Sequence, residues 1–115
     1  MPTWNDDLPI YRQLAGRLAG QLLDGDPAEG EAMPSVRTLA SHNVINRLTV
    51  TRALQSLVDD GLVESRRGVG MYVQRGARQR LKQAERRRFL TEEWPQIVAR
   101  ARQLGLGPDD LKWED

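Results

Sequence analysis

Apolar residues recur at helical spacing in three stretches of the first half of this chain. The first stretch begins at residue 8 and stops at Gly25. Its apolar side chains lie four residues apart, at Ile10, Leu14, Leu18 and Leu22. This spacing predicts one apolar helix face, and Pro9 is tolerated in the first turn because its missing N–H has no partner there. Gly16 and Gly20 indicate either close approach of another helix or of DNA phosphates, or simple tolerance of glycine.

Two further helical patterns follow, and each begins with a residue that can cap a helix. Ser35 precedes a short helix expected over Val36–His42, and Asn46 precedes a longer helix that stops at Gly61. Serine and asparagine cap helices because their side-chain oxygen accepts a bond from a free backbone N–H of the first turn. The longer helix has an apolar stripe at Val50, Leu54, Leu57 and Val58. Two helices joined by about four residues have the spacing of a helix-turn-helix.

After Gly61 the pattern changes from helical to strand-like. The runs Leu62–Ser65 and Met71–Gln74 flank Arg66–Gly70, which predicts a β-hairpin with Arg66 and Arg67 at its tip. Glycines at that tip allow the backbone to approach a phosphate or a minor groove closely. The two glycines precede a strand rather than a helix, so they do not form a dinucleotide-binding fingerprint. The order of three helices and a hairpin predicts a winged helix-turn-helix over residues 8–76.

Residues 77–115 are expected to form a helical tail. The first tail helix covers residues 77–94, and Pro95 either kinks it or begins another helix. A second apolar stripe follows and stops at Gly105. Two such helices cannot bury their apolar faces alone, which favours a homodimer interface over packing of the tail on its own winged helix. The expected dimerisation residues are Leu81, Phe89, Leu90, Trp94, Ile97, Val98, Ala101 and Leu104.

The distribution of charge points to a partner for the predicted fold. Net charge is only +1, yet residues 35–76 carry +3 and residues 77–90 carry +5, whereas the flanking segments are acidic. Basic charge is therefore concentrated where a phosphate backbone would be met. The helix after Asn46 carries its acids only at its end, and its front half holds Arg47, Thr49, Thr51 and Arg52. A cationic, hydroxyl-rich front suits insertion into a groove of nucleic acid.

The residues that the sequence lacks exclude several classes of function. There is no cysteine, which excludes a disulfide framework and a thiolate metal site. His42 is the only histidine, and without a second ligand type nearby we expect neither a metal nor a cofactor. No acid–base or nucleophilic constellation is present, so we do not expect an enzyme. Short apolar runs and an acidic N-terminus predict no membrane span and no signal peptide, hence a cytoplasmic protein.

Five segments match a known pattern when they are taken together. Pro9–Leu14 is similar to an opening signature, and Met33–Ala40 is similar to the motif Leu-Pro-Ser-x-Arg-x-Leu-Ala. Asn46–Ala53 resembles a recognition helix, and Asp60–Val73 resembles a wing. The tail segment Phe89–Leu106 resembles the short C-terminal segment of a subfamily. The chain as a whole resembles a GntR-type transcription regulator of the short YtrA-like subfamily.

This resemblance implies roles for residues on the two short helices. Arg37 would contact a phosphate or a base edge beside the groove. Arg47 and Thr49 would read base edges or neighbouring phosphates, because an arginine fork can take guanine bidentately and a hydroxyl suits either partner. Thr51 stands where larger family members carry an arginine that can contact a base. Arg52 would take over part of that role.

The resemblance also implies roles for the wing and identifies the partners. Arg67 and Gly68 would bring the wing tip to the minor groove. The partner would be double-stranded DNA with a palindromic operator, bound by a homodimer that represses transport-related genes. Only 39 residues follow Gly76, too few for an enclosed effector domain in one subunit, and the effector is unknown. The alternative is a protein-interaction adaptor that reuses a winged helix. The full expected DNA-binding set is Ser35, Arg37, Arg47, Thr49, Thr51, Arg52, Arg66, Arg67 and Gly68.

Overall fold

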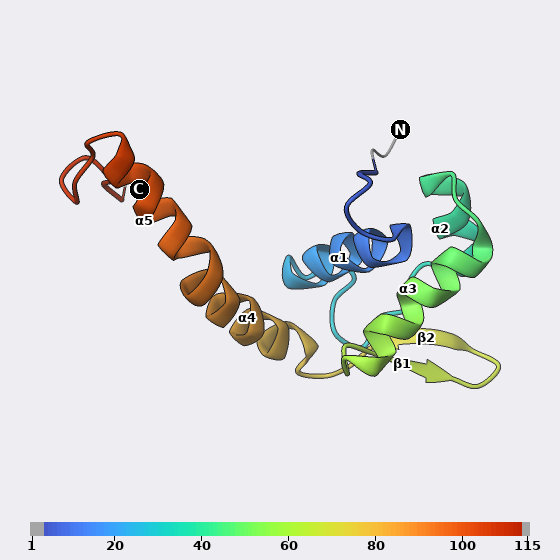
Figure 1. Cartoon of the computed structure of the whole chain (residues 1–115). Coiled ribbons are helices and arrows are strands. Elements are labelled where there is room, and N and C mark those ends of the chain that lie inside the picture. The colour runs from blue at the N-terminus through green and yellow to red at the C-terminus, as the bar shows by residue number, and fades with distance from the viewer. Residues whose placement is uncertain (1–3, 114–115) are drawn as a thin grey trace. The chain divides into compact units, whose positions relative to one another are not determined.

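The computed structural model describes residues 4–113, which divide into two compact units with the boundary between Leu81 and Lys82. The first unit is mainly helical with one two-stranded antiparallel hairpin, which confirms the predicted fold (Figure 1). No helix within the described part of the chain is long and apolar enough to cross a membrane. The elements in chain order are α1 (Ile10–Leu23), α2 (Val36–Asn43), α3 (Arg47–Asp59), β1 (Val63–Arg66), β2 (Gly70–Val73), α4 (Ala77–Arg88), η1 (Phe89–Glu93) and α5 (Trp94–Gln103).

The caps of α2 and α3 are formed by the residues that the sequence indicates. The Ser35 hydroxyl oxygen accepts a hydrogen bond from the Thr38 backbone N–H at 3.1 Å. The Asn46 side-chain oxygen accepts one from the Leu48 backbone N–H at 2.6 Å. Each bond satisfies one of the donors that a helix leaves open at its N-terminus. Both helices therefore begin where the capping residues predict.

A valine forms the turn between α2 and α3 in a conformation that valine rarely adopts. Val44 has a φ of +53°, and the bond from the Ile45 N–H to the Ala40 carbonyl (3.1 Å) closes the turn. A β-branched side chain in the left-handed region crowds its own backbone. Burial does not offset this strain, since Val44 is 62% exposed. The turn is therefore a point of stored strain in the helix-turn-helix.

Replacing Val44 by asparagine should stabilise the protein. Asparagine tolerates a positive φ, so the change should add about 1 kcal/mol to the free energy of unfolding. For a domain of this size, that gain raises the midpoint of thermal unfolding by roughly 3–6 °C. Val44→Thr is the matched control because it keeps the branched side chain. Equal midpoints for the two variants in a circular dichroism melt would contradict the strain at this turn.

The core of the first unit lies where α1 crosses α3 and where both meet the hairpin. Six side chains are almost fully buried there: Leu14, Leu22, Val50, Leu54, Leu57 and Val63. The stripes predicted for α1 and α3 thus face one another. Gly16 and Gly20 do not lie at this contact, since apart from their chain neighbours and their own helix backbone no described atom is within 4 Å of where a Cβ would stand on either glycine. Close packing inside the described chain therefore does not explain these two glycines.

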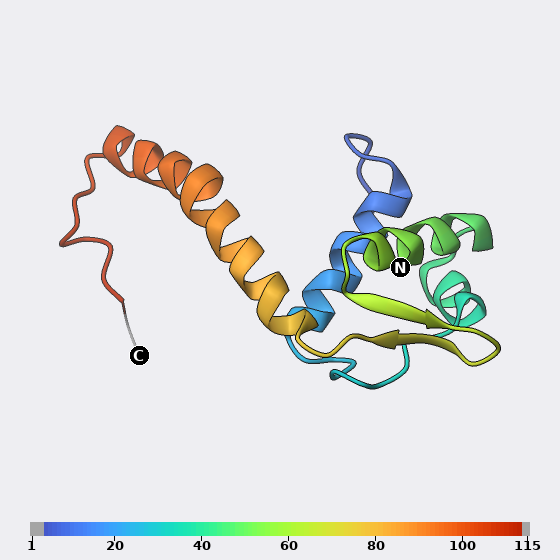
Figure 2. The same cartoon turned by 90° about the horizontal axis from the view of Figure 1, so that it is seen from below.

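The hairpin differs from its predicted form in two ways. β1 extends through Arg66, which pairs with Gly70, so the turn consists of residues 67–69 and Arg66 is not at the tip (Figure 2). The loop before α2 also pairs with the outer edge of β2, through bonds from the Gly30 N–H to the Val73 carbonyl and from the Met33 N–H to the Met71 carbonyl. Because these bonds join residues about forty positions apart, no local pattern predicts them.

The first turns of α4 belong to the core of the first unit. Ala77 and Leu81 are buried, and the Arg78 side chain donates a hydrogen bond to the Leu23 carbonyl at 2.8 Å. The Gly76 N–H also bonds the Glu29 carboxylate at 2.6 Å. The boundary between the units therefore lies within α4, five residues after the predicted one. Leu81, expected among the dimerisation residues, instead packs in this core because its helix begins against α1.

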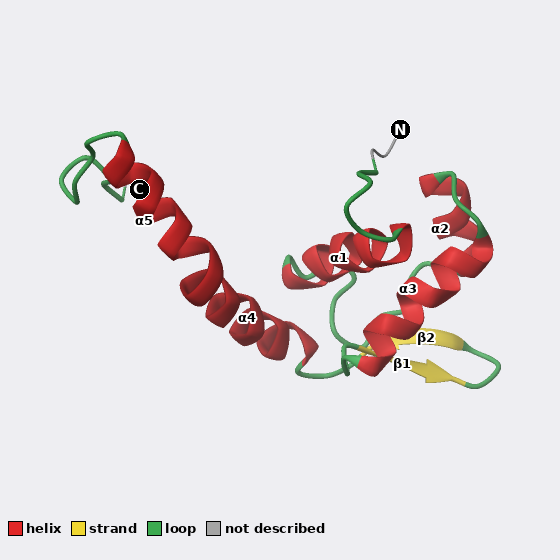
Figure 3. Cartoon of the chain, viewed as in Figure 1, coloured by secondary structure: helices red, strands yellow, loops and turns green. Residues whose placement is uncertain are grey.

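The helix of the second unit passes Pro95 without ending (Figure 3). One wide turn, η1, precedes the proline, and the Trp94 N–H bonds the Phe89 carbonyl five residues back. Proline lacks an N–H, and its ring crowds the carbonyl four residues earlier, so a wider turn makes room for it. Pro95 then occupies the first turn of α5. The structure thus combines the two outcomes expected at Pro95, since the helix is locally deformed and a new α-helical segment begins.

Candidate nucleic-acid interface

The nine predicted DNA-binding residues all lie in the first unit, on α2, α3, the hairpin and the residues that cap the helices. All are exposed except Thr49, which is half-buried. Two views at right angles place α2, the N-terminal half of α3 and the hairpin turn at the same side of this unit (Figures 1 and 2). No acidic residue lies in the first turn of α2 or of α3, so the positive ends of both helix dipoles are uncompensated there. This side of the unit is therefore suited to an anionic partner.

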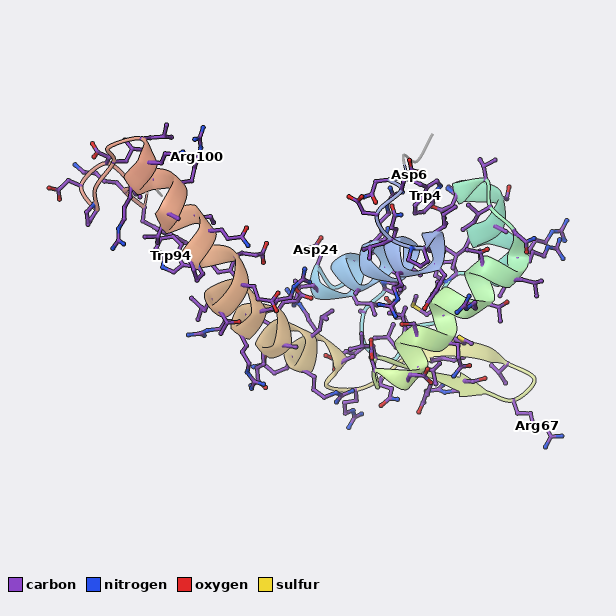
Figure 4. The ribbon with its side chains drawn as sticks, in the orientation of Figure 1. Trp4, Asp6, Asp24, Arg67, Trp94 and Arg100 are labelled. Carbon is purple, nitrogen blue, oxygen red and sulfur yellow. The ribbon has the colours of Figure 1, made fainter. Side chains whose placement is uncertain are left out.

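A groove of about 540 Å³ runs between the start of α2 and the hairpin turn. Four predicted residues line it: Ser35, Arg66, Arg67 and Gly68. Arg67 projects outward from the turn (Figure 4). Gly68 has a φ of +75°, a conformation that side chains resist, so the turn needs glycine here. The groove thus combines a projecting cation with backbone that a ligand can approach closely.

Arg66 has a different role from the one expected at a hairpin tip. Its guanidinium pairs with the Glu64 carboxylate at 3.1 Å and lies 4.0 Å from the centre of the Tyr72 ring. Both contacts are on the hairpin itself and hold the arginine along the strands. Because the pair with Glu64 is exposed, it is weak and reduces the local positive charge without removing it. Arg67, rather than Arg66, is the cation that the turn presents.

A second hollow, of about 500 Å³, lies between the start of α1 and the first turns of α3. Thr49 and Arg52 line it together with Tyr11, and the Arg52 guanidinium stacks on the Tyr11 ring at 4.1 Å from its centre. The Arg12 side chain donates a hydrogen bond to the Tyr11 hydroxyl at 3.2 Å, and this bond lowers the pKa of Tyr11 below its ordinary value. Two guanidinium groups are therefore gathered around one phenol.

The sequence indicates neither Tyr11 nor Arg12 as part of the site. From the sequence, Tyr11 is only a residue beside the apolar stripe of α1. Its contact with Arg52 joins residues 41 positions apart, so no local pattern predicts it. The one available signal is an aromatic residue at the front of α1 beside the apolar stripe, and in the structure Tyr11 is half-buried against the edge of the core. The contact shows that α1 positions a cation of α3 as well as packing against it.

The remaining predicted residues divide into exposed cations and hydroxyls with local partners. Arg37 and Arg47 lie in the first turns of α2 and α3, and neither lines the groove or the hollow. The Thr51 hydroxyl donates to the Arg47 carbonyl at 3.0 Å, and the Ser35 hydroxyl donates to the Thr38 side chain at 2.9 Å. In these bonds both hydroxyls donate their proton locally, and their oxygens remain able to accept from a ligand. Residues 4–113 contain no group of three or more histidines and acids that could hold a metal ion.

Two relatives with known names share most of this unit. The repressor YtrA of Bacillus subtilis is 31% identical over 103 residues, which is 90% of this chain and 78% of the relative. The mannosyl-D-glycerate transport/metabolism system repressor MngR of Escherichia coli is 38% identical over 65 residues, or 56% of this chain. Some relatives are much longer, since the chain spans 27% of MngR and 15% of the Bacillus subtilis regulator YisV.

Solved structures agree with the sequence comparisons. A GntR family transcriptional regulator from Listeria monocytogenes superposes with a TM-score of 0.75 and 25% identity, covering 93% of this chain and 92% of that one. The DNA-binding domain of AraR, solved in complex with operator ORE1, superposes with a TM-score of 0.57 and 26% identity over 63% of this chain and 89% of that one. The family described as bacterial regulatory proteins, gntR family, matches residues 10–73, from the start of α1 to the end of β2. The chain belongs to the GntR family.

Proposed function

We propose that this protein is a DNA-binding transcription regulator that acts as a homodimer on a palindromic operator and represses transcription. The observation that carries the proposal is that α2, the N-terminal half of α3 and the hairpin turn lie at one side of the first unit (Figures 1 and 2). These elements carry the exposed cations Arg37, Arg47 and Arg67. The solved complex of the AraR domain with its operator supports DNA as the ligand of this fold. The names of YtrA and MngR support repression, and that of MngR supports a target in transport. Binding to chromosomal DNA implies a cytoplasmic location.

In the proposed complex, the first turns of α3 enter the major groove. Arg47 and Thr49 then meet base edges, and Arg37 meets the backbone beside them. Arg67, at the hairpin turn, reaches the adjacent minor groove, where narrow A·T-rich segments attract arginine. Arg12 and Arg52 contact a phosphate, since Tyr11 orients both guanidinium groups without neutralising them, Arg12 through a hydrogen bond and Arg52 through stacking.

The second unit supplies the proposed dimer contact. Its exposed apolar residues Leu90, Trp94, Ile97 and Leu104 are separated by four, three and seven residues, the spacing of a coiled-coil seam. Ala101 completes this spacing and is buried within its own unit, while the Phe89 and Trp94 rings lie 6.4 Å apart between centres. Val98, which is half-buried, flanks the seam. Ala101 is the only buried side chain in the described part of this unit, so a partner surface is needed to cover the rest.

Binding to duplex DNA at several salt concentrations tests the proposal against the adaptor alternative. A regulator should bind random duplex DNA at low salt, with a logarithmic salt slope of about −0.9 for each phosphate that it neutralises. With roughly four such contacts in each subunit, a dimer should show a slope steeper than about −5. Fluorescence anisotropy with a labelled duplex measures both quantities. A protein that binds no duplex at 50 mM salt would be an adaptor instead.

A further inference from the structure

Leu48 is a large apolar side chain in the part of α3 that is proposed to meet DNA. It is 75% exposed, whereas the stripe residues Val50, Leu54 and Leu57 are buried. Two residues along a helix correspond to about 200°, so Leu48 points almost opposite to Val50. It therefore contributes nothing to the core, and its apolar surface faces outward from the first turn.

The surroundings of Leu48 combine cations with apolar side chains. Arg47 and Thr49 flank it in the chain. Asn46 and Arg52 line the same hollow, which is also lined by Pro9, Ile10 and Tyr11 from the start of α1. A second copy of this protein would bring the same cations to such a surface, so charge repulsion disfavours a contact between copies here. An anionic partner that also carries an isolated apolar group fits better.

We infer that Leu48 contacts the 5-methyl group of a thymine in the major groove. The inference rests on the proposed function and adds to it a preference for thymine at one position of each half-site. The thymine methyl is the one apolar group that base pairs present in the major groove, among donors and acceptors that suit Arg47 and Thr49. A leucine between two polar residues that contact base edges can therefore distinguish thymine from cytosine by contact with that methyl.

Deoxyuridine substitution isolates this contact because uracil pairs as thymine does and lacks only the methyl. The operator is first selected from a random duplex pool with the full chain. Each thymine of one half-site is then replaced in turn by deoxyuridine. At one position the replacement should weaken binding of the unmodified protein about three- to tenfold. Leu48→Ala should bind the two duplexes with equal affinity, within about twofold.

Leu111→Ala is the matched control, since it removes an exposed leucine from the second unit and should keep the discrimination of the unmodified protein. Equal thermal unfolding midpoints show that Leu48→Ala is folded. Tight operator binding that no deoxyuridine weakens would overturn the inference and leave the proposed function intact. Discrimination that persists in Leu48→Ala would also overturn it. Failure to select or bind any duplex would overturn both.

Discussion

Arg47→Ala should lower affinity for the selected operator by about 10- to 100-fold while leaving the thermal unfolding midpoint almost unchanged. Loss of an arginine that meets a base edge or a phosphate costs about 1–3 kcal/mol of binding free energy. Arg47 is the first residue of α3 and is exposed, so its removal leaves no cavity in the core. The change should appear in a gel-shift titration with the selected operator, with a melt of the same sample as the folding control.

Two further variants serve as a control for charge and identify the kind of contact that Arg47 makes. Arg102→Ala removes one exposed positive charge from the second unit and should change affinity by less than about threefold, because it lies outside the proposed interface. Arg47→Lys keeps the charge and loses the planar fork, so it separates a phosphate contact, which lysine restores, from bidentate reading of guanine, which it does not. Operator binding by Arg47→Ala as tight as that of the unmodified protein would remove α3 from the proposed interface.

The elements that the sequence predicts are those fixed by short-range rules. Ser35 and Asn46 bond N–H groups two or three residues away, and the stripe of α3 repeats within single turns. Such features depend only on the residue and its near neighbours, so they can be predicted from the sequence. The ends of α1, α2 and α3 consequently lie within about two residues of the expected positions.

The features that the sequence does not predict depend on contacts between distant residues. Arg52 stacks on Tyr11 only because α1 and α3 cross, and the Met33 N–H reaches the Met71 carbonyl only because the loop returns beside β2. For Leu81 the local pattern predicts an apolar contact but does not determine which one. Its spacing suits either a dimer seam or a core, and the docking of the first turns of α4 decides for the core. The local sequence pattern identifies which helix faces are apolar or cationic, and tertiary packing determines what each face contacts.

Ile97→Glu should separate the proposed dimer and weaken operator binding by at least about 100-fold. A carboxylate in the middle of the seam would be desolvated without a partner, and an unpaired buried charge strongly destabilises an apolar contact. Each subunit would then bind its half-site alone and lose the effective concentration that the linked pair provides. Sedimentation at low micromolar concentration should show the unmodified protein at twice its chain mass of 13.0 kDa and the variant at that mass.

Ala99→Glu is the matched control for the dimer test. It introduces the same charge into α5 two residues away, at about 200° around the helix, on the face opposite the seam. This variant should remain a dimer with unchanged operator affinity. No residue of α5 belongs to the core of the first unit, so both variants should keep the winged helix folded. If the unmodified protein sediments as a monomer, or if both glutamates act alike, the exposed seam of the second unit is not a dimer contact. Packing of the tail on its own subunit is then the better explanation.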